Sequence, residues 1–84
     1  MMAKKVVPFP FPEQPREITS AFLGGCVKAK RTHAGLTMHQ AAMLCGVSVD
    51  VFTKLENAKG SVTLESFLKV ANGLGLDMQF GDHL

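Results

Sequence analysis

Basic side chains are concentrated in the middle of this chain, where they could contact phosphate groups. Between residues 28 and 60 they outnumber the acidic ones, Asp50 and Glu56, by three; they are Lys28, Lys30, Arg31, Lys54 and Lys59. From residue 61 onward one basic residue faces three acidic ones, and the whole chain has a net charge of +2. The basic middle can neutralise phosphates, although an ordinary solvated surface accounts for it equally well.

Side chains suited to catalysis or metal binding are not arranged for either. Cys26 and Cys45 fall at apolar helix positions, and no CxxC or HxxxH spacing joins them to His33 or His39. The sequence contains no nucleophile–base pair and no phosphate-binding loop. We therefore expect no enzyme, no cofactor, no metal ion, and free thiols rather than a disulfide.

Length and composition predict one small domain. The chain has 84 residues, 46% of them hydrophobic, which is enough for one core. No apolar run approaches the roughly 20 residues that span a bilayer. Prolines interrupt what could otherwise be the apolar stretch of a signal peptide. We expect no membrane segment, no secretion signal and a cytoplasmic location.

Two short helices joined by a tight turn are predicted over residues 35–57. Thr37 and Gln40 form a capping-box pattern at the start of the first helix. Gly46 permits the turn, and Ser48 is a good N-cap for the second helix. Such a unit holds one helix on a core and presents the next to a partner, which is the geometry of a DNA reader.

Two further helices complete an all-α domain over residues 18–75, in which the two-helix motif occupies about 37–56. One helix covers about residues 19–33, where Gly24 and Gly25 should weaken it by roughly 1 kcal/mol each. Another is capped by Thr63 and ends at Gly73 and Gly75. Its expected core stripe is Leu64, Phe67, Leu68, Ala71 and Leu74.

The two ends of the chain differ from the helical middle. Residues 1–17 contain all four prolines, with Phe9 and Phe11 between them, and should be extended. This segment is either a free tail or, as we favour, a strap docked on the domain. Residues 76–80 alternate apolar and polar, which is typical of a strand. We expect this strand, within the 76–84 tail, to pair with its copy in a dimer through Leu76, Met78 and Phe80, or with residues 5–7.

These residues and their spacing resemble the lambda-repressor/Cro-like (XRE-type) helix-turn-helix family over about residues 19–75. The resemblance rests on residues 28–31, 35–37, 41–42, 46–48, 52, 55–57 and 63–70. Within that family the chain looks most like the HipB-type antitoxins, because its last helix passes into a short strand. The resemblance implies four or five helices, a homodimer, a palindromic operator in the chain's own operon, and a HipA-like kinase toxin as partner.

The resemblance also implies which residues contact DNA. The helix after residue 48 would enter the major groove, with base edges read by its first exposed positions. Phosphates would be held by the start of the preceding helix and by the end of this one, with basic residues nearby as flanking charge. The implied DNA-binding residues are Met38, Ser48, Val49, Asp50, Thr53, Lys54, Asn57, Lys59, Lys28 and Arg31.

Three of these residues depart from the family pattern. Met38 stands where glutamine is common, and it can neither hydrogen-bond phosphate nor steady a reading residue. Val49 offers only apolar contact with a thymine methyl group. Asp50 can accept from a cytosine amino group but repels phosphate; alternatively it only complements the helix dipole, which contributes about 0.3–1 kcal/mol. Asn57, which the resemblance assigns to phosphate, could equally be a helix C-cap residue.

Met43 and Leu44 lie off the core stripe, where relatives usually have charged residues. Either Phe9 or Phe11 of the strap covers them, which we favour, or they form a protein-binding patch.

From the helix-turn-helix spacing and the resemblance, the first hypothesis for function is a DNA-binding repressor that is also the antitoxin of a HipA-like kinase. The alternatives are a protein-interaction module with weak or lost DNA binding and a stand-alone phage-type repressor.

Overall fold

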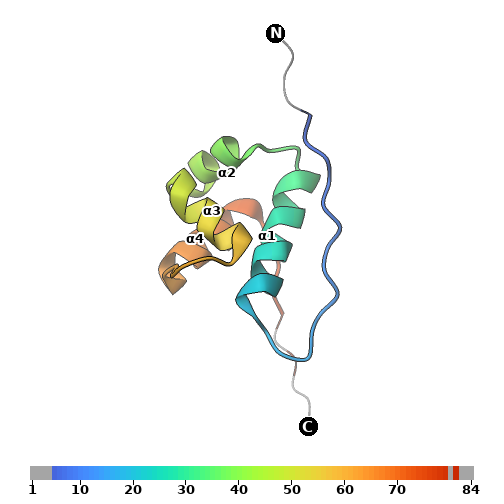
Figure 1. The fold of residues 1–84 in the computed structure, drawn as a ribbon. Helices are drawn as coiled ribbons and strands as arrows, with labels where there is room; N and C mark the ends of the chain where they lie inside the picture. The colour runs from blue at the N-terminus through green and yellow to red at the C-terminus, as the bar shows by residue number, and fades with distance from the viewer. Residues whose placement is uncertain (1–4, 80, 82–84) are drawn as a thin grey trace.

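Four helices make up the part of the chain that the computed structural model describes, residues 5–79 and 81 (Figure 1). They are α1 (Ser20–His33), α2 (Met38–Cys45), α3 (Val49–Asn57) and α4 (Leu64–Leu74). Each begins after a Thr or Ser whose side-chain oxygen accepts a backbone N–H three residues on; these caps are Thr19, Thr37, Ser48 and Thr63. The all-α prediction is confirmed, with four helices rather than five.

Each helix ends at or just before a left-handed residue that turns the chain sharply. Gly46, after α2, has φ 74°, which a side chain would disfavour, and the next amide, that of Val47, donates to the carbonyl of Ala42. The same exit follows α3, but there the left-handed residue is Ala58, with φ 55°. These exits fix the short connections between α2, α3 and α4.

The core lies between the four helices and combines two phenylalanines with smaller aliphatic side chains and a cysteine. Phe52 and Val27 are fully buried on α3 and α1. The remaining members of the cluster are Ala41, Ala42, Cys45, Leu55, Phe67, Val70 and Ala71. The alanines of α2 bring its backbone close to its neighbours, so its place in the domain is fixed by close packing.

The predicted stripe of α4 is partly wrong. Leu64 is 72% exposed and Leu68 is 44% exposed, whereas Val70 is fully buried. The buried face of α4 consists of Phe67, Val70 and Ala71, where the helix packs against α2. Leu64 is the first residue of the helix, at the edge of the packed region, and its i+4 neighbour Leu68 shares that outer side.

Gly24 and Gly73 are needed for close packing between helices. A Cβ on Gly24 would lie 2.5 Å from the carbonyl oxygen of Leu55 on α3. A Cβ on Gly73 would lie 2.7 Å from the sulfur of Cys45 on α2. The sequence pattern indicated only the cost of Gly24 to its own helix, but that residue also lets α1 approach the backbone of α3.

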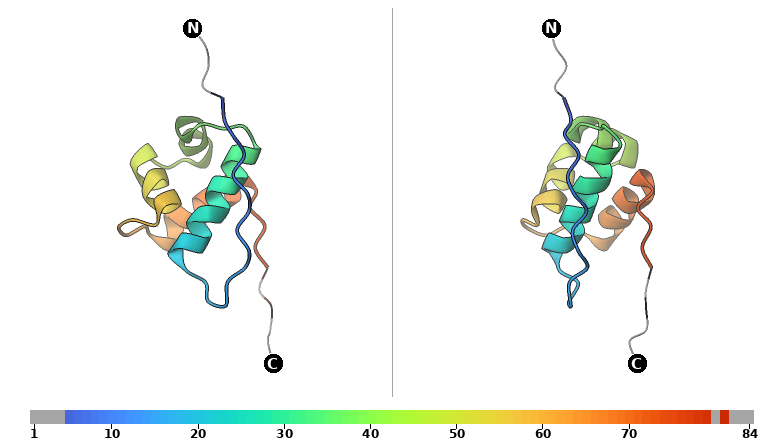
Figure 2. Two further views of the ribbon diagram at one scale, coloured as in Figure 1. Left: turned by 45° about the vertical axis from the view of Figure 1, so that its right-hand side comes forward. Right: turned by 90° about the vertical axis from the view of Figure 1, so that its right-hand side faces the viewer.

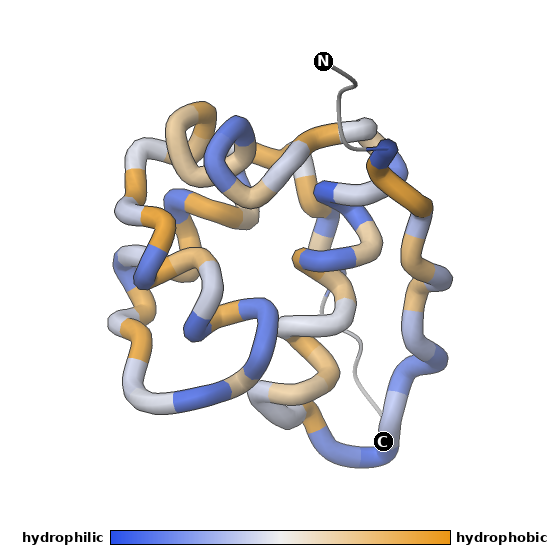
Figure 3. The backbone as a smooth tube through the Cα atoms, turned by 45° about the horizontal axis from the view of Figure 1, so that its top comes forward, coloured by the Kyte–Doolittle hydropathy of each residue, from blue (hydrophilic) through white to orange (hydrophobic). Residues whose placement is uncertain are grey.

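The Pro-rich segment is a strap that runs antiparallel to α1, on the side away from α3 (Figures 1 and 2). The backbone N–H of Phe9 donates to the hydroxyl of Thr32 at 2.7 Å, and the Phe9 carbonyl lies 3.0 Å from Nε2 of His33. The rings of Phe11 and His33 are 5.2 Å apart. These contacts dock the strap on the last turn of α1. Figure 3 shows that hydrophobic residues occur in the strap as well as in the helices.

The expected C-terminal strand is not seen. Leu76 to Gln79 contain no strand, and no strand occurs elsewhere in residues 5–79. A strand needs a partner to complete its hydrogen bonds, and residues 5–7 do not supply one. Phe80, the third expected pairing residue, lies outside the described residues. No helix in the described part of the chain is long and apolar enough to cross a membrane.

Candidate nucleic-acid interface

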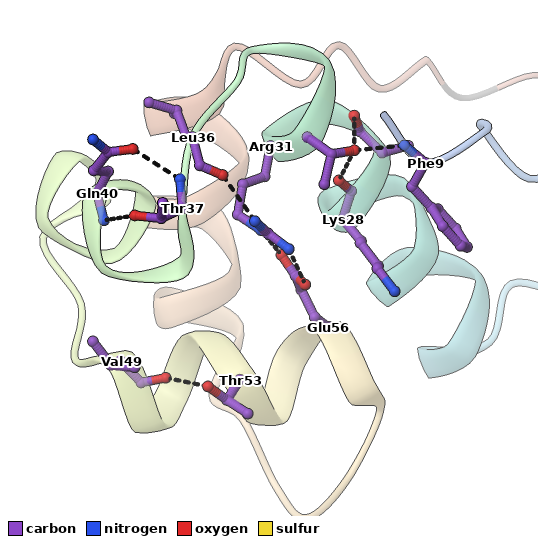
Figure 4. Close-up of polar contacts among 11 residues, drawn as sticks. Phe9, Lys28, Arg31, Leu36, Thr37, Gln40, Val49, Thr53 and Glu56 are labelled. Atoms are coloured by element: carbon purple, nitrogen blue, oxygen red, sulfur yellow. Dashed lines mark hydrogen bonds and ion pairs between the residues drawn. The ribbon is translucent and has the colours of Figure 1, made fainter. Parts of the chain in front are cut away.

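α2, the turn at Gly46 and α3 pack together as one unit, in which α3 has an outward face. The capping box of α2 is closed on both sides, since the Gln40 side chain accepts from the Thr37 amide at 2.8 Å and the Gln40 backbone amide donates to the Thr37 hydroxyl at 3.2 Å (Figure 4). After the turn, Val47 packs against the core. The position of α3 is therefore set at its start by the packing of the turn.

A buried ion pair fixes the other end of α3. Arg31 on α1 donates through Nε to Glu56 on α3 at 2.5 Å and through a second guanidinium nitrogen at 3.1 Å (Figure 4). The same guanidinium donates to the carbonyl of Leu36 at 2.8 Å, just before α2. The Arg31 and Glu56 side chains are only 11% and 2% exposed. One guanidinium thus ties α1, α3 and the entry to α2 together.

The expectation that Arg31 contacts phosphate is therefore wrong. Its side chain is only 11% exposed, and each of its three guanidinium nitrogens donates to Glu56 or to the Leu36 carbonyl, so it is not presented to DNA. The sequence does contain a signal for this pair. Glu56 follows Phe52 by four positions and so lies on the buried face of α3, where a charge needs a partner.

The outward face of α3 carries Asp50, Lys54 and Asn57, which are all exposed. The ammonium of Lys54 lies 3.2 Å from the carboxylate of Asp50, one helical turn away. Lys59 is exposed just beyond the helix, where its amide donates to the carbonyl of Lys54. The candidate interface therefore holds two lysines, one of them already paired with an acid.

The other predicted reading residues are less free than their sequence positions suggest. Val49 and Met38 are half-buried and pack against the core. The hydroxyl of Thr53 donates to the carbonyl of Val49 at 2.8 Å, which leaves only its acceptor capacity (Figure 4). The Ser48 hydroxyl accepts from the amide of Val51 as the α3 cap.

Lys28 is not brought together with the residues of α3. Its ammonium lies 4.5 Å from the centre of the Phe9 ring, over the strap. Figure 4 shows Lys28 beside Phe9 on one side of α1, while Val49 and Thr53 lie on the other. The strap contact gives Lys28 a local role in holding Phe9.

Met43 and Leu44 form an uncovered apolar patch on α2. Met43 is 84% exposed and Leu44 is 59% exposed. The favoured interpretation, that Phe9 or Phe11 covers them, is wrong, because both rings dock on α1 instead. The patch remains a candidate protein-binding surface.

Cys26 and Cys45 both carry free thiols. Burial raises the pKa of the Cys26 and Cys45 thiols, which keeps them protonated near neutral pH. The Cys45 sulfur lies 3.6 Å from the carbonyl of Val70 inside the core. In the described residues, no three His, Cys, Asp or Glu side chains are grouped to hold a metal ion.

A capped helix, a glycine turn and a second helix anchored at both ends define a helix-turn-helix protein. The family model described as Helix-turn-helix (HTH_3) matches residues 27–80, which is more than half of the chain. The chain belongs to this helix-turn-helix family, whose members are DNA-binding regulators and not enzymes. Among curated proteins, comparison of the sequence finds no match.

Solved structures share the fold at a TM-score of 0.70. A chain of a structure described as "Structure of HipA-HipB-O2-O3 complex" is 25% identical, over 82% of this chain and 97% of that one. A chain described as "MDT Protein" gives the same values. A chain of "HipB(S29A)-O2 20mer complex", at 24% identity over 83% of this chain and 97% of that one, shows the fold alone. The likeness to HipB-type chains agrees with the resemblance seen in the sequence.

Proposed function

We propose that the chain is a sequence-specific transcriptional repressor and the antitoxin and autoregulator of an operon that encodes a HipA-like kinase toxin. The observation that carries the DNA-binding part is the presentation of α3. Its inner face is held by Phe52, Leu55 and the Arg31–Glu56 pair, while Asp50 and Lys54 stay exposed. A helix held in this way can enter a major groove without reorganising the domain.

Phosphate contacts are assigned to Lys54, Lys59 and Asn57, which lie at or just beyond the C-terminal half of α3. Base contacts are assigned to the start of the helix, at Ser48, Asp50 and Thr53. Val49 and Met38 contribute mainly by packing on the core, which helps to hold α3 in place.

A homodimer is the form that we propose to bind DNA. Two copies related by a twofold axis match a palindromic operator with half-sites one helical turn, about 34 Å, apart. Dimer contacts are assigned to the tail, where Met78 is partly exposed and Leu76 is anchored to the core. The toxin assignment is supported by likeness to the chain from the structure described as a HipA-HipB complex.

A gel shift with the DNA upstream of the chain's own coding sequence tests the repressor function. We expect a shift at low salt that competitor DNA of random sequence removes only in large excess. Failure to shift this DNA, both alone and with the product of the adjacent gene, would refute the repressor. A HipA-like kinase gene next to this one distinguishes the antitoxin from a stand-alone phage-type repressor.

The exposed patch of Met43 and Leu44 favours a second candidate, a protein-interaction module. The double substitution Met43→Gln and Leu44→Gln should weaken binding to the adjacent gene product while leaving the DNA gel shift unchanged. A matched control is Leu64→Gln with Leu68→Gln, which alters two exposed apolar residues on α4. Equal effects of both double variants would argue against a role for the α2 patch.

A further inference from the structure

The start of α3 has few free groups that could distinguish one base pair from another. The Ser48 hydroxyl caps the helix, the Thr53 hydroxyl donates to a backbone carbonyl, and Val49 packs on the core. Asn57 lies two turns further along, at the end of the helix. The Asp50 carboxylate is therefore the most available polar group at the end of the helix that faces the bases.

Asp50 also forms an ion pair with Lys54, the basic residue on the same face of α3. Its side chain is 75% exposed and that of Lys54 is 46% exposed, with 3.2 Å between carboxylate and ammonium. The other acid of α3, Glu56, is buried against Arg31 and cannot compensate for Lys54. While the Asp50–Lys54 pair persists, this face of α3 presents almost no net charge to a phosphate.

We infer that Asp50 determines specificity by making the phosphate contact of Lys54 depend on the base in front of it. A carboxylate accepts hydrogen bonds only, so in the major groove it favours a base with an amino group, above all cytosine. Where the base supplies that donor, Asp50 is satisfied and Lys54 can turn to phosphate. Where the base presents an acceptor, Asp50 is repelled and keeps Lys54 paired.

This inference rests on the proposed DNA binding and predicts a variant that binds DNA better but less selectively. Asp50→Asn removes the charge, frees Lys54 and allows the side chain to donate as well as accept. Affinity for a random-sequence duplex should rise several-fold at low salt. On that random duplex, the slope of log K against log salt should steepen by about 0.9 per protomer, because the released Lys54 adds one phosphate contact in each protomer.

The test compares four purified proteins, the unaltered chain and three variants, by fluorescence anisotropy on the upstream DNA and on a random duplex of equal length. Glu65→Gln is the matched control, because it removes one exposed acid from the first turn of α4. We expect the ratio of specific to random affinity to fall about tenfold in Asp50→Asn, as when one base-specific hydrogen bond is removed, and to stay unchanged in Glu65→Gln. Adding Lys54→Ala to Asp50→Asn should return the salt slope to its original value.

The outcomes separate this inference from the proposed function. If the unaltered protein binds the upstream DNA selectively and Asp50→Asn keeps the same ratio and slope, the role of Asp50 is wrong and the repressor stands. Equal changes in Asp50→Asn and Glu65→Gln would reduce the effect to net charge and also overturn it. If the unaltered protein binds neither duplex at low salt, both alone and with the product of the adjacent gene, both proposals fail.

Discussion

Arg31 and Asp50 are charged residues that sequence position alone places together on a DNA-binding surface, and the structure separates them. Arg31 is enclosed with Glu56 between α1 and α3, whereas Asp50 is exposed and pairs with Lys54. A buried charge without its partner is costly, while an exposed ion pair contributes little because water screens it. The two pairs should therefore respond very differently to the removal of their acids.

Glu56→Ala should lower the free energy of unfolding by about 3–5 kcal/mol, since it leaves the Arg31 guanidinium buried and uncompensated. Asp50→Ala, on the same helix, should cost at most about 1 kcal/mol. Urea unfolding followed by circular dichroism measures both. Similar losses of stability in the two variants would show that the buried pair does not hold α3.

At the scale of elements, all four described helices begin at a Ser or Thr cap and end in a left-handed residue or just before one. Three of the caps, Thr37, Ser48 and Thr63, could be predicted because they precede apolar periodic stretches, and the structure shows each of them accepting the expected amide. The exit of α3 differs from the others because Ala58, and not glycine, occupies the left-handed position. This residue is therefore a point of local strain at the end of the proposed reading helix.

Replacing Ala58 by glycine should stabilise the domain by up to about 1 kcal/mol, because a left-handed alanine costs roughly 1–2 kcal/mol and glycine returns part of this as chain entropy. The melting temperature should rise by about 4 °C or more if the full gain is realised. Ala34→Gly is the control, since Ala34 ends α1 with φ −81° and gains no relief. A lower melting temperature for Ala58→Gly would contradict the assigned strain.

The fold could be predicted further than the site. Helix bounds follow from local chemistry, so the capping box and Gly46 were sufficient to place α2 and α3. Side-chain roles depend on contacts across the chain. The position of Glu56 on the buried face of α3 indicates that it needs a partner, but the sequence could not show that this partner is Arg31 or that Lys28 lies over Phe9. The exposure of Met43 could not be predicted either, because it depends on the path of a strap whose docking site is on α1.

At the scale of the whole molecule, the described parts of the strap and of the tail (residues 76–79) both lie beside α1, on sides not occupied by α3 (Figure 2). The strap covers one side, and a groove of about 180 Å³ separates it from the tail, lined by Ile18, Phe22, Cys26 and Met78 among others. Neither the strap from residue 5 onward nor residues 76–79 of the tail cover the outward face of α3, where Asp50, Lys54 and Asn57 are exposed. This arrangement permits dimerisation through the tail without blocking the proposed DNA-binding face.

Removal of residues 77–84 should convert a dimer into a monomer while leaving the four helices folded, because Leu76, which packs on the core, is kept. Light scattering gives the mass, and circular dichroism shows whether the helices remain. A truncated protein that stays dimeric would place the interface elsewhere. A full-length protein that is monomeric at high concentration would refute the proposed dimer itself.

The most direct test of DNA binding through α3 is the salt dependence of binding to the upstream DNA, measured for the unaltered protein and for Lys54→Ala with Lys59→Ala. The double variant should bind both DNAs more weakly, with the larger loss on the upstream DNA, where Asp50 releases Lys54 to phosphate. Its slope of log K against log salt on that DNA should be shallower by about 0.9 for each phosphate that is no longer neutralised. Lys28→Ala, on the strap side of α1, should leave the slope unchanged. An unchanged slope in the Lys54 and Lys59 variant, or a reduced slope in Lys28→Ala alone, would contradict DNA binding by this face.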